Sequence, residues 1–244
     1  MILPVERGGK AEGVRVVELL AVLSLGADLG MGQPMEHVLR QTLLALRLAE
    51  RLRLEESARS SLYYSSLLAW VGCHVDAYEQ AKWFGDDLAL KGDFRKTDVS
   101  RATSGVAFML RHLGAGRPLL ERARLGIAFP GEGSRAAERM LGNHWLAADH
   151  LASRLGMTDA VRKSIEQTFE RWDGKGVPHG ASGQAILVTS RLITLADVVE
   201  VFRRAGGVDA AIEVARQRSG TQFDPALVDL FCTDAHELLE ASTT

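Results

Sequence analysis

Apolar residues recur along this chain at spacings of three and four residues, and this helical period constrains the fold more than any other feature. Stretches in which polar and apolar residues alternate, as they do in half-buried strands, are hard to find. Hydrophobic residues make up 46% of the 244 residues, which is enough to build a sizeable core. The sequence therefore predicts an all-α protein.

Glycine and proline divide the periodic pattern into separate helical segments. Helices are expected at about 14–29, 35–53, 57–73, 76–91, 97–113, 117–128, 134–155, 159–171, 185–204, 208–217 and 224–240. Thr158 and Asp224 suit N-cap positions, and Pro225 suits the first helical residue because its missing N–H is not needed there. Residues 173–183 are expected to form a glycine-rich loop, and 114–133 to be either a hinge or a surface loop.

Charge and cysteine content narrow the class of protein. The formal net charge is -2, so no basic surface is expected to hold nucleic-acid phosphates. Cys73 and Cys232 are too few for a disulfide framework. The N-terminus lacks the apolar core of a signal peptide, and no run of about 18 apolar residues could span a bilayer. These features predict a cytoplasmic protein that contacts neither membrane nor nucleic acid directly.

Three expected helices carry an ionisable residue where the period calls for an apolar one. They are His37, His144 and Asp197. An unpaired buried carboxylate costs several kcal/mol, so Asp197 is expected to have a partner or to be protonated. Two imidazoles and a carboxylate suit a divalent metal. A single buried histidine is more often a hydrogen-bonded core residue, and periodicity alone leaves open whether the three converge.

Three segments of the C-terminal half carry a specific set of motifs. Residues 170–178 read Glu-Arg-Trp-Asp-Gly-Lys-Gly-Val-Pro, residues 191–198 read Arg-Leu-Ile-Thr-Leu-Ala-Asp-Val, and residues 220–228 read Gly-Thr-Gln-Phe-Asp-Pro-Ala-Leu-Val. In this order and spacing they resemble the HD-GYP branch of the HD phosphohydrolases, whose signature is His-His-Glu-x-x-Asp-Gly-x-Gly-Tyr-Pro. Upstream, residues 37–40 resemble the family's opening His-x-x-Arg, and His144 falls at its isolated histidine.

The resemblance covers roughly 35–232 and implies an HD-domain-like helical bundle. It implies one domain over 10–242, with a first half over about 10–130 and a signature-bearing half over about 131–242. The helix expected at 14–29 lies outside the resemblance, and segment 76–130 is longer than the family's usual connection. The expected architecture is therefore the family bundle with an extra N-terminal helix and an enlarged central connection.

Several of the family's metal ligands are missing. Ala69 and Trp70 stand where the resemblance places the His-Asp pair, Thr168 and Phe169 stand for two histidines, and Val177 replaces the signature tyrosine. The missing aspartate bridges two metals in the family, and an indole neither ligates a metal nor leaves room for one. The resemblance therefore implies that two-metal hydrolysis is disabled.

The residues that remain define the candidate sites. The alignment retains His37, His144 and Asp197, and His74 lies one helical turn beyond Trp70. These four could hold one divalent metal, either iron, manganese or zinc, although His74 could equally face solvent at a helix end. The candidate ligand-binding residues are Arg40, Trp70, Asp173, Lys175 and Arg191.

Three functions remain open from the sequence. The first is a catalytically degenerate HD-GYP-like domain with a regulatory, ligand-sensing or scaffolding role in signalling. The second is an active metal-dependent phosphodiesterase that hydrolyses cyclic di-GMP or another nucleotide. The third is a protein–protein interaction module without a small ligand. The expected partners are a nucleotide ligand and either a second copy of the chain or another protein. Relatives often continue into a helix-turn-helix domain that regulates transcription, so the chain is either a sensory part or a stand-alone protein.

Overall fold

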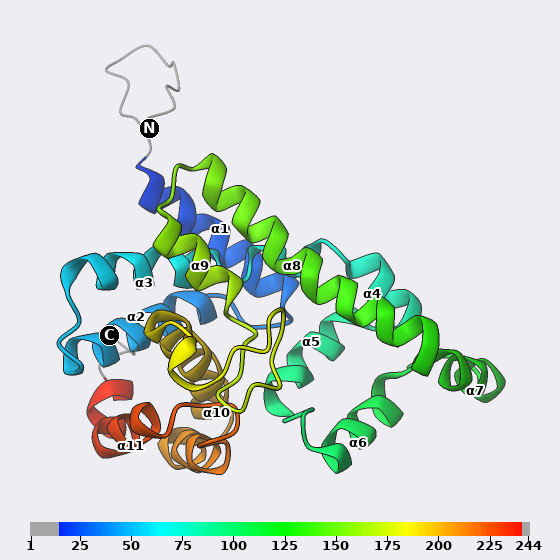
Figure 1. Ribbon diagram of the computed structural model, residues 1–244. Coiled ribbons are helices and arrows are strands. Elements are labelled where there is room, and N and C mark those ends of the chain that lie inside the picture. Colours follow the sequence, from blue (N-terminus) through cyan, green and yellow to red (C-terminus); the bar gives the residue numbers. More distant parts are fainter. Residues whose placement is uncertain (1–14, 241–244) are drawn as a thin grey trace.

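The computed structural model describes residues 15–240, and this part of the chain contains helices and no β-strand. The prediction of an all-α protein is confirmed (Figure 1). In chain order the elements are α1 (Val16–Gly30), α2 (His37–Arg51), α3 (Glu56–Leu68), η1 (Val71–His74), α4 (Ala77–Phe84), α5 (Asp87–Lys96), α6 (Ala102–His112), α7 (Leu119–Ala128), η2 (Phe129–Gly133), α8 (Ser134–Arg154), α9 (Asp159–Glu166), η3 (Gly183–Ala185), α10 (Val188–Gln217) and α11 (Pro225–Glu240). The predicted limits 10–14 and 241–242 lie outside the described residues.

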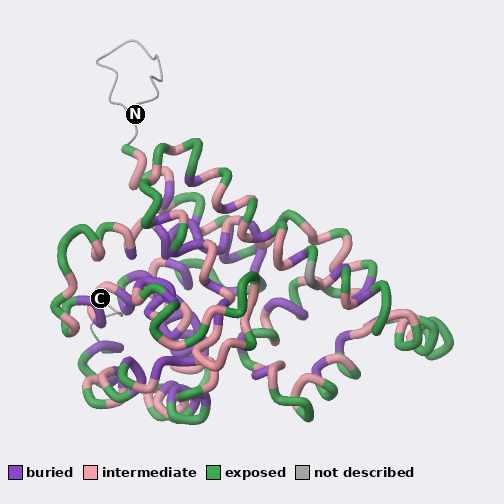
Figure 2. Tube along the Cα trace, viewed as in Figure 1, coloured by how far each residue is buried: buried purple, intermediate pink, exposed green. Residues whose placement is uncertain are grey.

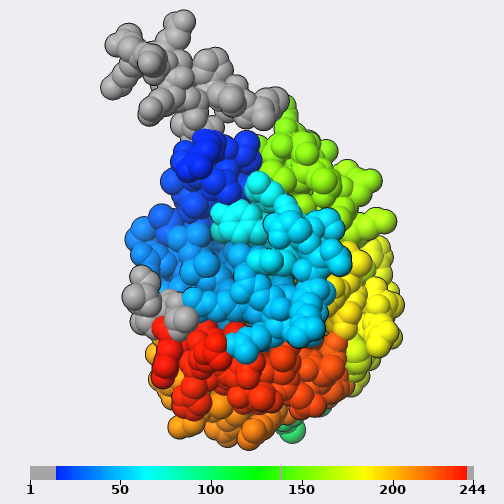
Figure 3. All heavy atoms as spheres, turned by 90° about the vertical axis from the view of Figure 1, so that its left-hand side faces the viewer, coloured from blue at the N-terminus to red at the C-terminus, as the bar shows by residue number. Residues whose placement is uncertain are grey.

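The main core forms around α10, which packs against α2, α3 and α11. The first half of α10 is buried on nearly all sides, as expected for a helix enclosed by others. Its fully buried residues include Leu192, Ile193 and Leu195. Figure 2 shows this buried centre, and Figure 3 shows the N-terminal helices packed directly above α11. The first half of α10 is therefore enclosed by the main core.

A second, smaller core belongs to the central connection. Helices α4 to α7 lie to one side of the main body in Figure 1, and α8 runs from them back to the body. The small core comprises Trp83, Phe84, Leu90, Phe108, Ala136 and Met140. Its last two members come from the first half of α8, whereas Ala148 and Ala152, further along α8, join the main core. Helix α8 therefore belongs to both cores and fixes one beside the other.

Two helix starts follow the predicted capping chemistry. The Thr158 hydroxyl accepts a hydrogen bond from the Val161 amide, and α9 begins at the next residue. Asp224 Oδ1 accepts from the Ala226 amide at 2.9 Å, and α11 begins at Pro225. Both predicted N-caps are confirmed.

The helices of the central connection differ from the prediction. The pattern indicated helices at 76–91 and 97–113, but the chain breaks at Gly85 and forms α4, α5 and α6 instead. Gly85 has a φ of 84°, and a Cβ there would lie 2.1 Å from the Ala115 carbonyl oxygen. The Asp86 side chain then caps α5 by accepting from the Ala89 amide.

Three other boundaries also moved. The helix expected to end at 171 stops at Glu166, and the one expected to end at 73 stops at Leu68. The helices expected at 185–204 and 208–217 run together as α10, with a kink at Gly206 and Gly207. No helix in the described part of the chain has both the length and the apolarity needed to cross a bilayer.

Candidate functional site

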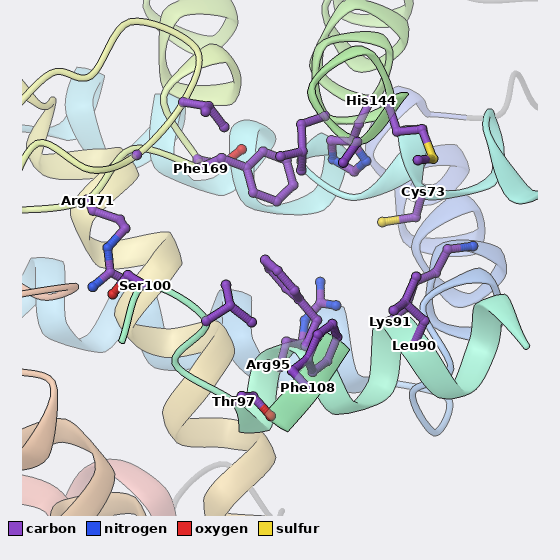
Figure 4. A pocket seen from close by; sticks show the side chains of 18 of the residues that line it. Cys73, Leu90, Lys91, Arg95, Thr97, Ser100, Phe108, His144, Phe169 and Arg171 are labelled. Carbon is purple, nitrogen blue, oxygen red and sulfur yellow. The ribbon is translucent and has the colours of Figure 1, made fainter. Parts of the chain in front are cut away.

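A cavity of about 580 Å³ lies between the main core and the helices of the central connection. Trp70 and Phe169 line it from the main body, and Phe84, Phe108 and Phe129 line it from the other side. In Figure 4, Phe169 and His144 face Arg95 and Phe108 across this space. The volume falls within the range of small-molecule sites. The cavity is therefore large enough for a ligand and has walls from two parts of the fold.

His37 is fully buried between two carboxylates of α10. Its Nε2 lies 2.8 Å from Asp197 Oδ1, and its Nδ1 is hydrogen-bonded to Glu200 Oε2. Burial alone would lower the pKa of His37, but the hydrogen bonds to Asp197 and Glu200 outweigh it, and the pKa lies above its usual value. Because both ring nitrogens face carboxylate oxygens, both carry a proton, and His37 is an imidazolium.

Arg95, from α5, supplies the second positive charge at Asp197. Its Nε donates to Oδ1 and Oδ2 of Asp197 at 3.0 and 2.9 Å, and its guanidinium lies 4.7 Å from the centroid of the Trp70 ring. Burial raises the pKa of Asp197, but the charges of Arg95 and His37 outweigh that effect and hold the pKa below its usual value. Asp197 is therefore an ionised carboxylate, as expected for one that has partners.

His144 is buried on the other side of Trp70. Its Nε2 donates to the Ala69 carbonyl oxygen at 2.8 Å, and its ring centroid lies 4.9 Å from that of Phe169 and 6.1 Å from that of Trp70. Burial is the main cause that lowers the pKa of His144, to about 4. The imidazole is therefore neutral near pH 7 and adds no charge to the cavity that it lines.

These contacts show which of the predicted metal ligands lie together. His37 and Asp197 lie together, but His144 does not join them as a third ligand, and residues 15–240 contain no group of three His, Cys, Asp or Glu side chains that could hold a metal ion. The physical reason is that the atoms that could ligate a metal already have other partners. Arg95 donates to both oxygens of Asp197, and both nitrogens of His37 face carboxylates.

His74 does not complete a metal site either. Its side chain packs against α1, where a Cβ on Gly30 would fall 1.9 Å from its Nε2. It is an exposed residue that does not line the cavity. His74 is the last residue of η1, and its ring lies against Gly30 of α1, whereas its neighbours Cys73 and Asp76 line the cavity.

The residues at the substituted family positions do not fit a two-metal centre. Trp70 and Phe169 are in edge-to-face contact at 5.8 Å, and Thr168 Oγ1, in the turn after α9, donates to the Ile165 carbonyl. Ala69 contributes only its carbonyl oxygen, to His144. Where the resemblance implies four ligands, the cavity wall holds the rings of Trp70 and Phe169 and the already bonded hydroxyl of Thr168, and Ala69 does not line the cavity.

The signature loop lies beside the site, as its motif predicts. Lys175, Gly176 and Val177 line the same cavity as Trp70 and Asp197. Of the predicted ligand-binding residues, Trp70 and Lys175 are therefore at the cavity. Trp70 is almost fully buried, whereas Lys175 is exposed and lies at the rim.

The other three predicted ligand-binding residues lie elsewhere and make local ion pairs. Arg40 is 2.6 Å from Glu36, one turn earlier on the same side of the chain. Arg191 pairs with Asp224 and so ties α10 to the start of α11. Asp173 accepts from the Lys175 amide at 3.1 Å, which shapes the loop. Because none of the three lines the cavity, they stabilise the frame around it.

Two residues of the site were missed by the sequence reasoning. Glu200 lies three residues after Asp197 on α10, so the helical period places both carboxylates on one face, and that signal was available. Arg95 gave no such signal, because its contact with Asp197 spans 102 residues and starts from a helix of the central connection. Cys73, Lys91 and Arg171 also line the cavity.

Comparisons with known proteins agree with this fold. Residues 131–227 match the family model described as HD domain. The chain is 28% identical over 214 residues to the 3'3'-cGAMP-specific phosphodiesterase 3 of Vibrio cholerae. These residues are 87% of this chain and 46% of that protein. A cyclic di-GMP phosphodiesterase of the same organism is 39% identical over 79 residues, which are 30% of this chain and 16% of that protein.

A solved structure extends the similarity to nearly the whole chain. The crystal structure of a cyclic GMP-AMP-specific phosphodiesterase of Vibrio cholerae matches with a TM-score of 0.68 and 25% identity, over 94% of this chain and 51% of that chain. The chain thus spans about half the length of these relatives or less. The similarity includes the helices of the central connection as well as the part with the signature motifs.

Proposed function

Because the chain belongs to the HD-domain phosphohydrolase family, we propose that it binds a small molecule in the cavity beside Asp197 and serves as a regulatory, ligand-sensing domain. The observation that carries the proposal is the Arg95–Asp197 ion pair. A guanidinium holds both oxygens of the carboxylate that the family resemblance assigns to a metal. A buried carboxylate needs a cation, and this chain supplies one from its own α5.

The position of the cavity supports a sensing role. Its walls come from the main core and from α4 to α6, and Arg95 connects the two across the space. A ligand shifts a conformational equilibrium only when it contacts two arrangements differently. A molecule that touches both walls would meet this condition, because any movement of α5 relative to α10 changes its contacts.

A hydrolysis assay tests the proposal. The purified protein, supplied with manganese or iron, should not hydrolyse cyclic di-GMP or 3'3'-cGAMP at an enzyme-like rate. Ligand binding should still be measurable by calorimetry with a panel of small molecules that includes nucleotides. Turnover on the order of one per second that disappears in Asp197→Ala would contradict the proposal.

A second candidate is the active metal-dependent phosphodiesterase. It is favoured by the names of the relatives, since the proteins that match over the chain are phosphodiesterases of cyclic dinucleotides. His37, His144 and Asp197 also occupy family ligand positions in this chain. For this function Arg95 would have to release Asp197 to a metal, and the same assay decides between the two candidates. Failure to bind any small molecule would favour a scaffolding role with a protein partner.

A further inference from the structure

The wall of the cavity is apolar over most of its area. The main body contributes Trp70 and Phe169, and the central connection contributes Phe84, Phe108 and Met109. The latter belong to the small core that the central connection builds with α8. An apolar wall of this extent selects ligands whose bodies are hydrocarbon or aromatic, because water leaves both surfaces on binding.

Most of the cations around the cavity already have partners. Lys91 is 2.7 Å from Asp87, Arg171 is 3.2 Å from Asp98, and Arg95 is bound to Asp197. Among the basic side chains that line the cavity in residues 15–240, only the Lys175 ammonium makes no ion pair. It lies at the rim, where a ligand group can contact it and remain partly in water.

On the basis of the proposed function, we infer that the cavity takes an amphipathic organic acid, with an apolar body between the two aromatic walls and one acidic group at Lys175. A ligand with two phosphates needs two unpaired cations, and burying the second phosphate without one is unfavourable. The cavity of about 580 Å³ offers space for the body and a single rim charge for the acid.

The two cysteines provide a direct readout of occupancy. Cys73 lines the cavity, whereas Cys232 lies on α11 outside it, and both thiols are free. We would measure the alkylation rate of each cysteine by N-ethylmaleimide, with and without laurate or 1-naphthoate, using mass spectrometry of the separate peptides that contain Cys73 and Cys232 after the reaction is quenched and the chain digested. Since burial raises the pKa of the Cys73 thiol to about 11, a mildly alkaline buffer is needed. Both acids should slow alkylation of Cys73 severalfold and leave Cys232 unchanged.

Variants and a neutral ligand test the two halves of the inference. Met109→Gln places an amide on the apolar wall and should weaken laurate and dodecanol at least about fivefold. Leu110→Gln, at the next residue but 71% exposed and outside the cavity, is the matched control and should weaken neither. Lys175→Gln should weaken laurate roughly two- to fivefold and leave dodecanol unchanged, because only laurate carries an acid.

The outcomes separate this inference from the proposed function. Protection of Cys73 by cyclic di-GMP but by neither organic acid would overturn the inferred ligand class and leave a ligand-binding function. No protection and no calorimetric binding by any of these molecules would overturn both. Protection by the acids that is unaffected by Lys175→Gln and Met109→Gln would place the ligand elsewhere and also overturn the inference.

Discussion

At the scale of single residues, Asp197 is ionised because cationic side chains stand where the family resemblance places a metal. Its neighbours are an imidazolium and a guanidinium, so the positive charge comes from side chains. The guanidinium of Arg95 is planar and is only weakly hydrated, which suits both the carboxylate and the face of Trp70. The same buried position therefore retains its aspartate while the chemistry around it differs.

The first prediction removes this cation. Arg95→Met leaves Asp197 and Glu200 buried with His37 as their shared partner, and it should destabilise the fold by about 3–5 kcal/mol. Combining it with Asp197→Asn should restore part of the loss, because the uncompensated charge is removed as well. Urea unfolding measures both effects. Lys96→Met, a neighbouring exposed cation, is the control, and equal stability of Arg95→Met and wild type would contradict the account.

The second prediction concerns pH and His144. Its folded-state pKa of about 4 lies below the unfolded value of 6.5, so the unfolded chain binds more protons between them. Its contribution to stability is fully present above pH 6.5 and is lost as the pH falls towards 4, by about 3 kcal/mol at most. His144→Phe should flatten this dependence in urea unfolding between these pH values. The exposed His150→Phe should leave it intact; an unchanged slope in His144→Phe would contradict the burial argument.

The contribution of His37 to stability depends on pH in the opposite direction to that of His144. Its pKa is raised in the folded protein, so its contribution is fully present below the unfolded value of 6.5 and is lost as the pH rises through the folded value. The His37 and His144 contributions therefore oppose each other, and together they favour maximal stability near neutral pH.

At the scale of elements, the sequence predicted the long amphipathic helices and the caps at Thr158 and Asp224. The central connection was harder, because its apolar period continues across Gly85 and hides the break between α4 and α5. The reason for the break is tertiary: the Gly85 backbone packs against the carbonyl of Ala115, which is distant in sequence.

The same principle explains what the sequence could not show of the site. His37, Asp197 and the signature loop were identified because their motifs are local. The contact of Arg95 with Asp197 depends on how two cores are placed relative to each other, which no local pattern encodes. The sequence therefore contains no signal that Arg95 holds the oxygens of Asp197.

The third prediction tests the break at Gly85. Gly85→Ala should destabilise the protein by more than about 1 kcal/mol, because φ is positive and the new Cβ would meet the Ala115 carbonyl. Hydrogen exchange should accelerate in α4 and α5 and remain slow in the buried first half of α10. Gly126→Ala is the control: it lies in α7 with open space around it, and alanine there should stabilise the helix by about 0.5–1 kcal/mol. A neutral Gly85→Ala would contradict the packing described.

At the scale of the whole molecule, the protein consists of two cores joined by α8 and by the Arg95–Asp197 pair. The cavity lies at their junction, where a bound molecule would contact both. The main core thus supplies Asp197 and His37, and the central connection supplies both the cation at Asp197 and much of the cavity wall.

Elemental analysis of the purified protein tests the central claim most directly. After incubation with manganese or iron and removal of free metal, the wild-type protein should hold no stoichiometric metal, because Arg95 occupies Asp197, the nitrogens of His37 face carboxylates, and Trp70 and Phe169 stand at two family ligand positions. Asp197→Ala should give the same value. One or two ions per chain in the wild type, lost in Asp197→Ala, would contradict the account and establish a metal centre at this carboxylate.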